Sequence, residues 1–150
     1  MGTHTEERGR PARDGGGVAT PLAFDVISGR LRELDIPTCD VVVGIASGGT
    51  VPAALVAHQL GLPLALVKLN FRDEDNVPRR PRPELLEAPP TLAPGARVLL
   101  VDEVSVTGAT LAAATALFPA QRVTTLVLKG EADVVAFPDL EGCVAWPWKG

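Results

Sequence analysis

Two adjacent acids, a glycine and several hydroxyl side chains lie within one short segment of this chain. The segment reads Val98-Leu99-Leu100-Val101-Asp102-Glu103-Val104-Ser105-Val106-Thr107-Gly108-Ala109-Thr110. Its apolar start predicts a buried strand, and the residues after the acids predict a turn that leads into a helix. Backbone amides of such a turn point toward one place and favour negative charge there. Thr107 and Thr110 add hydroxyl donors, and Gly108 lets the backbone approach a ligand closely. We therefore expect the turn to hold a phosphate.

Asp102 and Glu103 stand directly before this turn. Their carboxylates can accept hydrogen bonds from vicinal sugar hydroxyls, or they can face a hydrated magnesium ion. A phosphate site beside an acceptor for a diol fits a ribose phosphate. The plainer alternative is that the acids cap a helix in an ordinary strand-to-helix connection. The binding site is favoured because two acids end an apolar run and Thr-Gly-x-Thr follows.

Strands and helices alternate around this segment. Strands are predicted over residues 40–45, 64–69, 97–101 and 123–128, which are short runs rich in Val, Ile and Leu. Helices are predicted from Thr20-Pro21 to just before Pro37, over 50–60 and over 110–117. This order predicts an α/β fold with an open, mostly parallel, twisted sheet flanked by helices. Ligands of such sheets bind beyond the carboxyl ends of the strands, where the acids lie.

The acidic pair followed by Thr-Gly and a helix resembles the phosphoribosyl pyrophosphate signature of the type I phosphoribosyltransferases. Ser47-Gly48-Gly49 resembles the loop after the first strand with which this family contacts pyrophosphate. The resemblance covers about residues 20–148. Residues 70–94 fall where the family keeps a mobile lid, and they carry Arg79 and Arg80 among several prolines.

The resemblance implies a role for each matching residue. Asp102 and Glu103 would be the catalytic acids, which hold the ribose hydroxyls and the associated Mg²⁺, the expected cofactor. Contacts to phosphoribosyl pyrophosphate are implied for Ser47, Gly48, Gly49, Asp102, Glu103, Ser105, Val106, Thr107, Gly108, Ala109 and Thr110. The implied reaction transfers the phosphoribosyl group to a nucleobase and releases pyrophosphate.

Two late features resemble the 6-oxopurine enzymes of the family, which act on xanthine, guanine and hypoxanthine. Lys129 ends the predicted strand 123–128, where those enzymes place a lysine that donates to the oxo group of the base. Trp146-Pro147-Trp148 resembles the Pro-Trp ending of the xanthine-guanine branch. The base would thus meet Lys129, Val144 and Trp148 in a small C-terminal hood, although the tryptophans could equally serve the core or a dimer contact.

Three positions depart from the family pattern. Val106 stands where 6-oxopurine enzymes often have an aspartate, Ser47 where the pyrophosphate loop often has a basic residue, and Cys143 where a stacking aromatic is usual. These departures leave two alternatives open. One is a phosphoribosyltransferase for another base, such as adenine or a pyrimidine. The other is a non-catalytic regulator that binds a ribose phosphate or nucleotide on the same fold.

Composition limits the remaining classes of protein. The net charge of −4 over 150 residues argues against a nucleic-acid binder, and no apolar run is long enough for a membrane span. Two cysteines fit a reducing compartment, so a cytoplasmic location is expected. Residues 1–19 are polar and predict a disordered leader before a domain at 20–150. Relatives of this kind are commonly homodimers or homotetramers.

Overall fold

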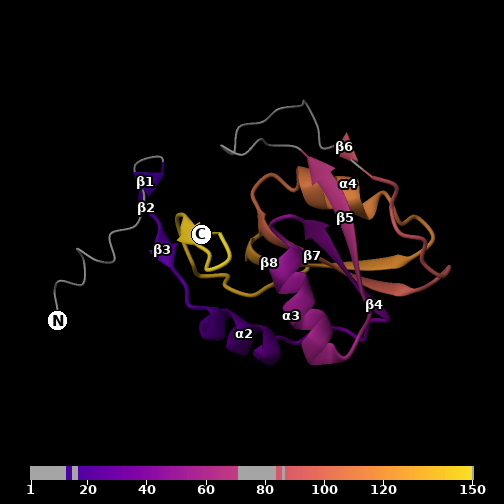
Figure 1. Cartoon of the computed structure of the whole chain (residues 1–150), viewed down its shortest axis with the longest axis horizontal. Helices are drawn as coiled ribbons and strands as arrows, with labels where there is room; N and C mark the ends of the chain where they lie inside the picture. Colours follow the sequence, from indigo (N-terminus) through magenta and orange to yellow (C-terminus); the bar gives the residue numbers. More distant parts are fainter. Residues whose placement is uncertain (1–12, 15–16, 71–83, 86, 150) are drawn as a thin grey trace.

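A six-stranded sheet forms the centre of the computed structural model, which describes residues 13–14, 17–70, 84–85 and 87–149 (Figure 1). The strand order is β6-β5-β4-β7-β8-β9. The bounds are β4 (Val41–Ala46), β5 (Leu64–Asn70), β6 (Glu84–Leu85), β7 (Arg97–Ser105), β8 (Arg122–Gly130) and β9 (Val134–Val135). All neighbours pair in parallel except β5 and β6. The predicted α/β fold with a mostly parallel sheet is confirmed.

Helices cover both faces of this sheet because alternate residues of a strand point to opposite sides. Val42, Leu99 and Val101 pack in one core with α2 (Phe24–Glu33) and α3 (Thr50–Leu60). Val43 and Leu100 pack in a second core with α4 (Ala109–Thr115). Figure 1 shows α2 and α3 on one side of the strands and α4 on the other. Strands buried on both faces explain the continuous apolar runs of the sequence.

The N-terminal part of the domain differs from the prediction. Thr20 and Pro21 form the short strand β3 (Thr20–Pro21), which pairs in parallel with β10 (Val144–Ala145). The amides of Thr20 and Leu22 donate to carbonyl oxygens near the C-terminus, at 2.8 and 3.4 Å. The predicted helix start at Thr20-Pro21 is wrong, because these donors bond to a distant strand and the helix begins at Phe24.

Other boundaries shift by a few residues. Helix α3 matches its prediction, whereas α4 spans 7 residues and ends before Leu117. The stretch 70–94, predicted without regular structure, contributes β6 as an antiparallel edge beside β5. The lid arginines Arg79 and Arg80 lie outside the described residues. None of the described helices has the length and apolar character needed to cross a membrane.

The predicted leader is described only in part. Strands β1 (Arg13–Asp14) and β2 (Gly17–Val18) pair antiparallel with each other. Residues 1–12 and 15–16 lie outside the description. The prediction of a disordered leader before a domain at 20–150 therefore stays a prediction.

Candidate functional site

The strand order changes direction between β4 and β7. The chain passes from β4 through α3 to β5 on one side, and from β7 through α4 to β8 on the other. The carboxyl ends of β4 and β7 are adjacent, since Gly44 pairs with Val101. The loop 47–49 and the turn 106–108 leave these two ends in opposite directions. A crevice at such a switch point is the ordinary ligand site of an open α/β sheet.

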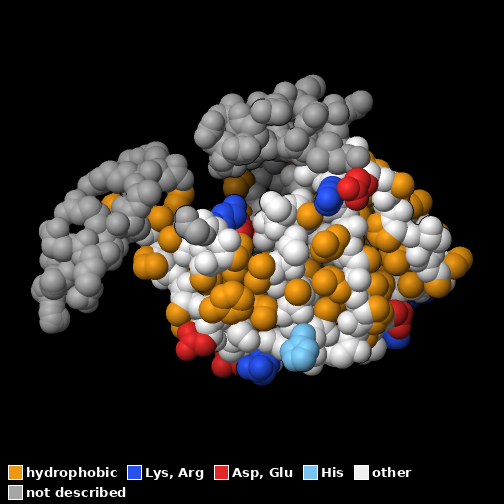
Figure 2. All heavy atoms as spheres, viewed as in Figure 1, with side chains coloured by type: hydrophobic (Ala, Val, Ile, Leu, Met, Phe, Trp, Pro, Cys, Tyr) orange, Lys and Arg blue, Asp and Glu red, His pale blue; other side chains and the backbone are white. Residues whose placement is uncertain are grey.

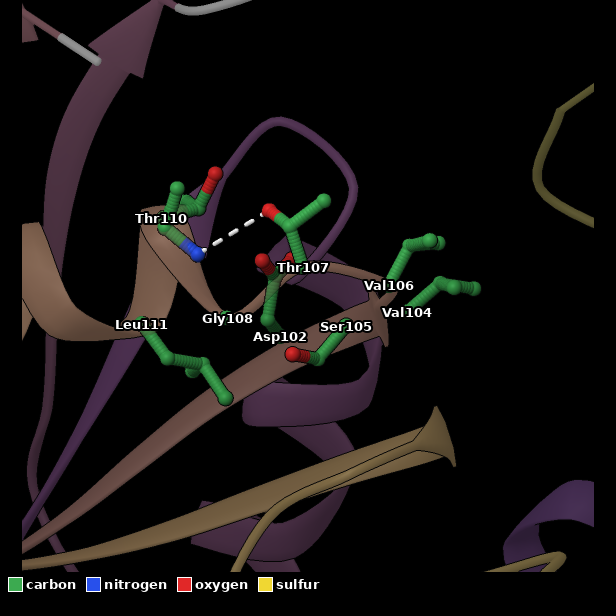
Figure 3. Close-up of a pocket in the computed structure, with 9 residues that line it drawn as sticks. Asp102, Val104, Ser105, Val106, Thr107, Gly108, Thr110 and Leu111 are labelled. Carbon is green, nitrogen blue, oxygen red and sulfur yellow. Dashed lines mark hydrogen bonds between the residues drawn. The ribbon is translucent and has the colours of Figure 1, made fainter. Parts of the chain in front are cut away.

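A small, solvent-open pocket lies at the end of β7. Its lining is Asp102, Val104, Ser105, Val106, Thr107, Gly108, Ala109, Thr110 and Leu111. In Figure 3 the polar ends of Asp102, Thr107 and Thr110 gather on one side of the turn, whereas Val104 and Val106 point away from them. The structure therefore brings together one carboxylate and the hydroxyl groups of the predicted phosphate turn.

The turn is held in shape by its own hydroxyl and glycine. Thr107 Oγ1 accepts a hydrogen bond of 3.2 Å from the amide of Ala109 (Figure 3). Gly108 precedes α4 with φ +84°, a conformation that residues with a Cβ rarely adopt. With only 7 residues, α4 has a small dipole, so hydroxyl and amide donors of the turn are the main attraction for an anion.

Ser105 places a hydroxyl at the base of this pocket. The residue is 7% exposed, and its Oγ has no hydrogen-bond partner among the described residues. A buried polar atom without a partner is uncommon and costs free energy. This hydroxyl is thus a group that a ligand, a water or a small movement of the turn would satisfy.

The loop after β4 lies directly against β7. A Cβ at Gly49 would stand 2.5 Å from the carbonyl oxygen of Val101 and 3.0 Å from Cα of Asp102. Only glycine fits this place, and it brings the loop 47–49 beside the acids. Ser47 at the tip is exposed, and the Ala46–Ser47 peptide bond is cis. The two predicted loops are therefore neighbours in space.

Asp102 has an altered proton affinity. Burial raises the pKa of its carboxyl to about 7, and the nearby charge of Glu103 acts in the same direction. The amide of Glu103 donates a 2.7 Å hydrogen bond to Asp102 Oδ1, and this bond and the charge of Lys149 oppose the rise. Asp102 is the one titratable side chain among those that line the described pocket. Near neutral pH it can exchange between the acid and the carboxylate.

Glu103 points elsewhere. It does not line the pocket, and it is 7% exposed. Both of its carboxylate oxygens are bound by residues of the C-terminal segment, residues 144–149. Trp148 Nε1 donates to Glu103 Oε2 at 2.7 Å, and Lys149 Nζ forms an ion pair with Oε1 at 3.2 Å. The two predicted acids thus face different partners, as successive residues of a strand do.

The residues predicted to contact a base lie around the same end of the sheet. Lys129 is paired with Val104 across β7 and β8, and its ammonium group makes no hydrogen bond or ion pair with another described residue. Val144 lies on β10 and packs against the core on the side of α2 and α3. Trp148 stacks on Trp146 with a centroid distance of 5.6 Å and an interplanar angle of 9°, so one face of its indole is covered.

Lys149 and Phe24 also belong to this arrangement, although the sequence alone assigns neither of them a role. Phe24 meets the ring of Trp148 edge-on, with centroids 5.9 Å apart. No local pattern marks either residue, because their partners lie far away in the sequence. The structure also assigns Trp146 to the core, where it is 6% exposed.

A magnesium ion fits these residues only together with a substrate. Among the described residues no group of three or more His, Cys, Asp or Glu side chains could hold a metal ion. Asp102 offers one carboxylate to the pocket, and Mg²⁺ commonly binds through one or two carboxylates, substrate phosphates and waters. The donor set is therefore adequate for a magnesium ion that arrives with a phosphorylated ligand.

Comparisons with known proteins agree with this geometry. The model of the phosphoribosyl transferase domain family matches residues 25–129. No curated protein matches the sequence. The fold is similar to a purine phosphoribosyltransferase from Pyrococcus horikoshii (24% identity, TM-score 0.65, 88% of this chain and 94% of that chain). It is also similar to the Helicobacter pylori xanthine-guanine-hypoxanthine phosphoribosyltransferase (15% identity, TM-score 0.67, 87% of this chain and 94% of that chain). A third similar structure is an orotate phosphoribosyltransferase from Aeropyrum pernix (26% identity, TM-score 0.52, 74% of this chain and 61% of that chain).

Proposed function

Because this chain belongs to the phosphoribosyl transferase domain family, we propose that it transfers the phosphoribosyl group of phosphoribosyl pyrophosphate to a purine base, with 6-oxopurines preferred. The observation that carries the proposal is the pocket at the end of β7, where Asp102 and the hydroxyl-bearing turn meet beside the loop 47–49. One carboxylate for a sugar diol and two neighbouring anion-binding loops match a ribose that carries phosphate at both ends.

The proposed reaction exchanges one bond at C1 of the ribose. The bond from C1 to pyrophosphate breaks, and pyrophosphate leaves with the electron pair. A ring nitrogen of the base bonds to C1 and loses its proton to water. Protein groups contribute by positioning and by stabilising charge. When bound, Mg²⁺ would neutralise charge on the pyrophosphate and favour its departure.

We assign the 5′-phosphate of the substrate to the turn from Ser105 to Thr110 and the pyrophosphate to the loop 47–49. Asp102 accepts from the ribose hydroxyls and faces the magnesium ion. Glu103 supports the site from the other side of β7, where the C-terminal segment holds it. Arg79 and Arg80 of the lid would add positive charge to the pyrophosphate.

The preference for a 6-oxopurine depends on Lys129. Its backbone lies beside that of Val104, at the edge of the pocket, and its ammonium group would donate to the oxo group of the base. Val144 and Trp148 would bound the base. Lys129→Ala should lower turnover with guanine, xanthine and hypoxanthine but leave adenine unaffected. Arg122→Ala, at the other end of the same strand, is the matched control.

A turnover assay tests the reaction. The protein, magnesium and phosphoribosyl pyrophosphate are mixed with guanine, xanthine, hypoxanthine, adenine, uracil and orotate in competition, and products are identified by mass spectrometry. Guanosine, xanthosine or inosine monophosphate as the main product would support the proposal. A main product from adenine, uracil or orotate would keep the reaction and reject the preference.

One observation favours a second candidate, a regulator that binds a ribose phosphate without turnover. At the rim of the pocket Val106 is 79% exposed, so an apolar side chain stands where a proton acceptor would help the incoming base. Binding of phosphoribosyl pyrophosphate without formation of any nucleotide would support this candidate and reject transfer to all six bases.

We also expect a homodimer or homotetramer. Phe24, Val26, Leu60, Leu64 and Leu66 are exposed apolar residues of α2, α3 and β5. Figure 2 shows apolar side chains gathered over the face formed by α2 and α3. A second copy would remove this surface from water. Light scattering coupled to size-exclusion chromatography tests the expectation, and a monomer at micromolar concentration would reject it.

A further inference from the structure

Glu103 joins three parts of the molecule. Its backbone belongs to β7, and its carboxylate is held by Trp148 and Lys149 of the C-terminal segment. Its side chain also faces the loop after β4. A Cβ at Gly48 would lie 3.5 Å from Glu103 Cβ and 3.6 Å from its Oε1, which is ordinary van der Waals contact. The C-terminal segment therefore reaches the loop 47–49 through one buried acid.

This placement creates an electrostatic requirement. A carboxylate beside a loop that receives an anion repels the anion unless its charge is compensated. Glu103 is 7% exposed, so water screens its charge poorly. The indole N–H of Trp148 and the ammonium group of Lys149 provide the compensation, one at each oxygen. Without them the buried charge would lack partners, and the side chain would move toward water or toward Gly48.

The C-terminal segment is built to hold its end of this contact. Trp148 is fixed by the parallel ring of Trp146 and by a T-shaped contact with Phe24. Trp146 is itself 6% exposed in the core, and β10 is tied to β3 just before it. The indole N–H is thus delivered to Glu103 by packed rings rather than by a free chain end.

We propose that Trp148 and Lys149 are positioning residues, which hold and neutralise Glu103 beside Gly48 and thereby set the affinity of the loop 47–49 for pyrophosphate. The inference rests on the proposed function, since that function assigns pyrophosphate to this loop. It gives the C-terminal segment a specific role at the leaving-group end of the substrate. The side chain of Glu103 does not line the pocket at the turn 105–110, where the ribose-phosphate end is assigned.

Two probes separate the two ends of the site: magnesium pyrophosphate for the loop and ribose 5-phosphate for the turn. Their dissociation constants are measured by calorimetry on the full chain. Trp148→Phe keeps an aromatic ring but removes the N–H donor. We expect it to weaken pyrophosphate binding about tenfold, within the usual range of coupling between contacting residues, while ribose 5-phosphate binding stays within about twofold. Equal weakening of both probes, or no weakening of either, would overturn the inference.

The matched control is Trp146→Phe, which shortens the same ring stack without touching Glu103. It keeps the N–H donor of Trp148 and loosens only its packing, so it should weaken pyrophosphate binding less than Trp148→Phe does. A loss of pyrophosphate affinity equal to that of Trp148→Phe would assign the effect to packing and reject the inference. If Trp148→Phe does not fold, Lys149→Gln tests the positioning role instead. Its side chain is 56% exposed, so the variant should fold, and it should weaken pyrophosphate binding about threefold and more than ribose 5-phosphate binding. Unchanged pyrophosphate affinity in this variant would count against the inference.

The failure of the inference differs from the failure of the proposed function. Wild-type protein that binds neither probe would remove the ribose-phosphate site itself. Wild-type protein that binds both, with variants that behave as wild type, would reject only the role of Trp148 and Lys149. Both tryptophans of the chain lie in the C-terminal segment, so intrinsic fluorescence verifies in each variant that this segment remains docked.

Discussion

The carboxyl groups of Asp102 and Glu103 serve opposite sides of β7. Asp102 faces the pocket with the turn 105–110, and its pKa is raised to about 7 by burial. Glu103 faces the C-terminal segment and is paired with Trp148 and Lys149. One acid is available to a ligand and can change its charge near neutral pH, whereas the other is fixed by partners. The expected effects of Asp102→Asn follow from this division.

Asp102→Asn should lower kcat/KM for phosphoribosyl pyrophosphate about a hundredfold, because an amide neither balances the charge of a metal ion nor accepts as strongly from a diol. In the wild type kcat/KM should fall below pH 7, since the free enzyme must lose the Asp102 proton. The variant should lack this dependence. The pH profile of both proteins is the measurement, with Asp35→Asn, an exposed acid, as control. A wild-type rate in Asp102→Asn would contradict the assignment.

The same variant should change stability in the opposite direction to activity. The pKa of Asp102 is higher in the folded chain than its ordinary value of 3.8, so the folded state binds more protons between pH 4 and pH 7. Stability from this group is present below pH 4 and is lost as the pH rises through 7. At pH 8 Asp102→Asn should therefore be more stable than the wild type, by up to roughly 4 kcal/mol. Urea unfolding at pH 4 and pH 8 measures this; equal differences at the two pH values would refute it.

Asp40 should contribute to stability with the reverse pH dependence. Arg97 holds its carboxylate through Nε and Nη2 at 3.0 and 2.8 Å and through its amide at 2.8 Å, and these hydrogen bonds lower the pKa of Asp40 to about 2. The contribution is present above pH 4 and is lost as the pH falls through 2. Asp40→Asn should unfold more easily than the wild type at pH 6, with the difference shrinking toward pH 2. Thermal unfolding at several pH values is the check, and a constant difference would be evidence against it.

Gly49→Ala should damage both fold and site. Its new methyl group would meet the carbonyl oxygens of Val101 and Ile45 at 2.5 and 2.7 Å, so the loop must move away from β7. We expect a loss of about 2 kcal/mol in unfolding free energy and weaker pyrophosphate binding.

The matched substitution is Gly29→Ala in α2, where a Cβ meets nothing within 4 Å. Alanine is the better helix former, so this variant should gain about 0.5–1 kcal/mol. Both values come from urea unfolding. A Gly49→Ala protein as stable as the wild type would show that the loop does not depend on this close approach.

The sequence pattern predicted the structure correctly where that structure depends on residues close together in the sequence. Helix α3 and the apolar centres of the four central strands follow from apolar runs, breakers and spacing, and residues 105–110 line the pocket. The predicted end of the third strand at Val101 is wrong, because β7 runs to Ser105 and both acids lie within it. The boundaries that failed depend on partners far away in the chain. Thr20 and Pro21 carry a helix-start signal, yet their backbone pairs with β10, more than a hundred residues later.

By itself the sequence determined the parallel sheet and placed two acids and a Thr-Gly turn together at one strand, because these features are local and strands of a parallel sheet end at one edge. The phosphate site predicted there stays a prediction. Only the tertiary structure decided which acid faces the pocket and what holds the other. The alternation of side chains along β7 separates Asp102 from Glu103, and the packing of the C-terminal rings brings Trp148 to Glu103 across 45 residues. Burial around Asp102 then sets its proton affinity, which is a property of the packed chain and not of any segment.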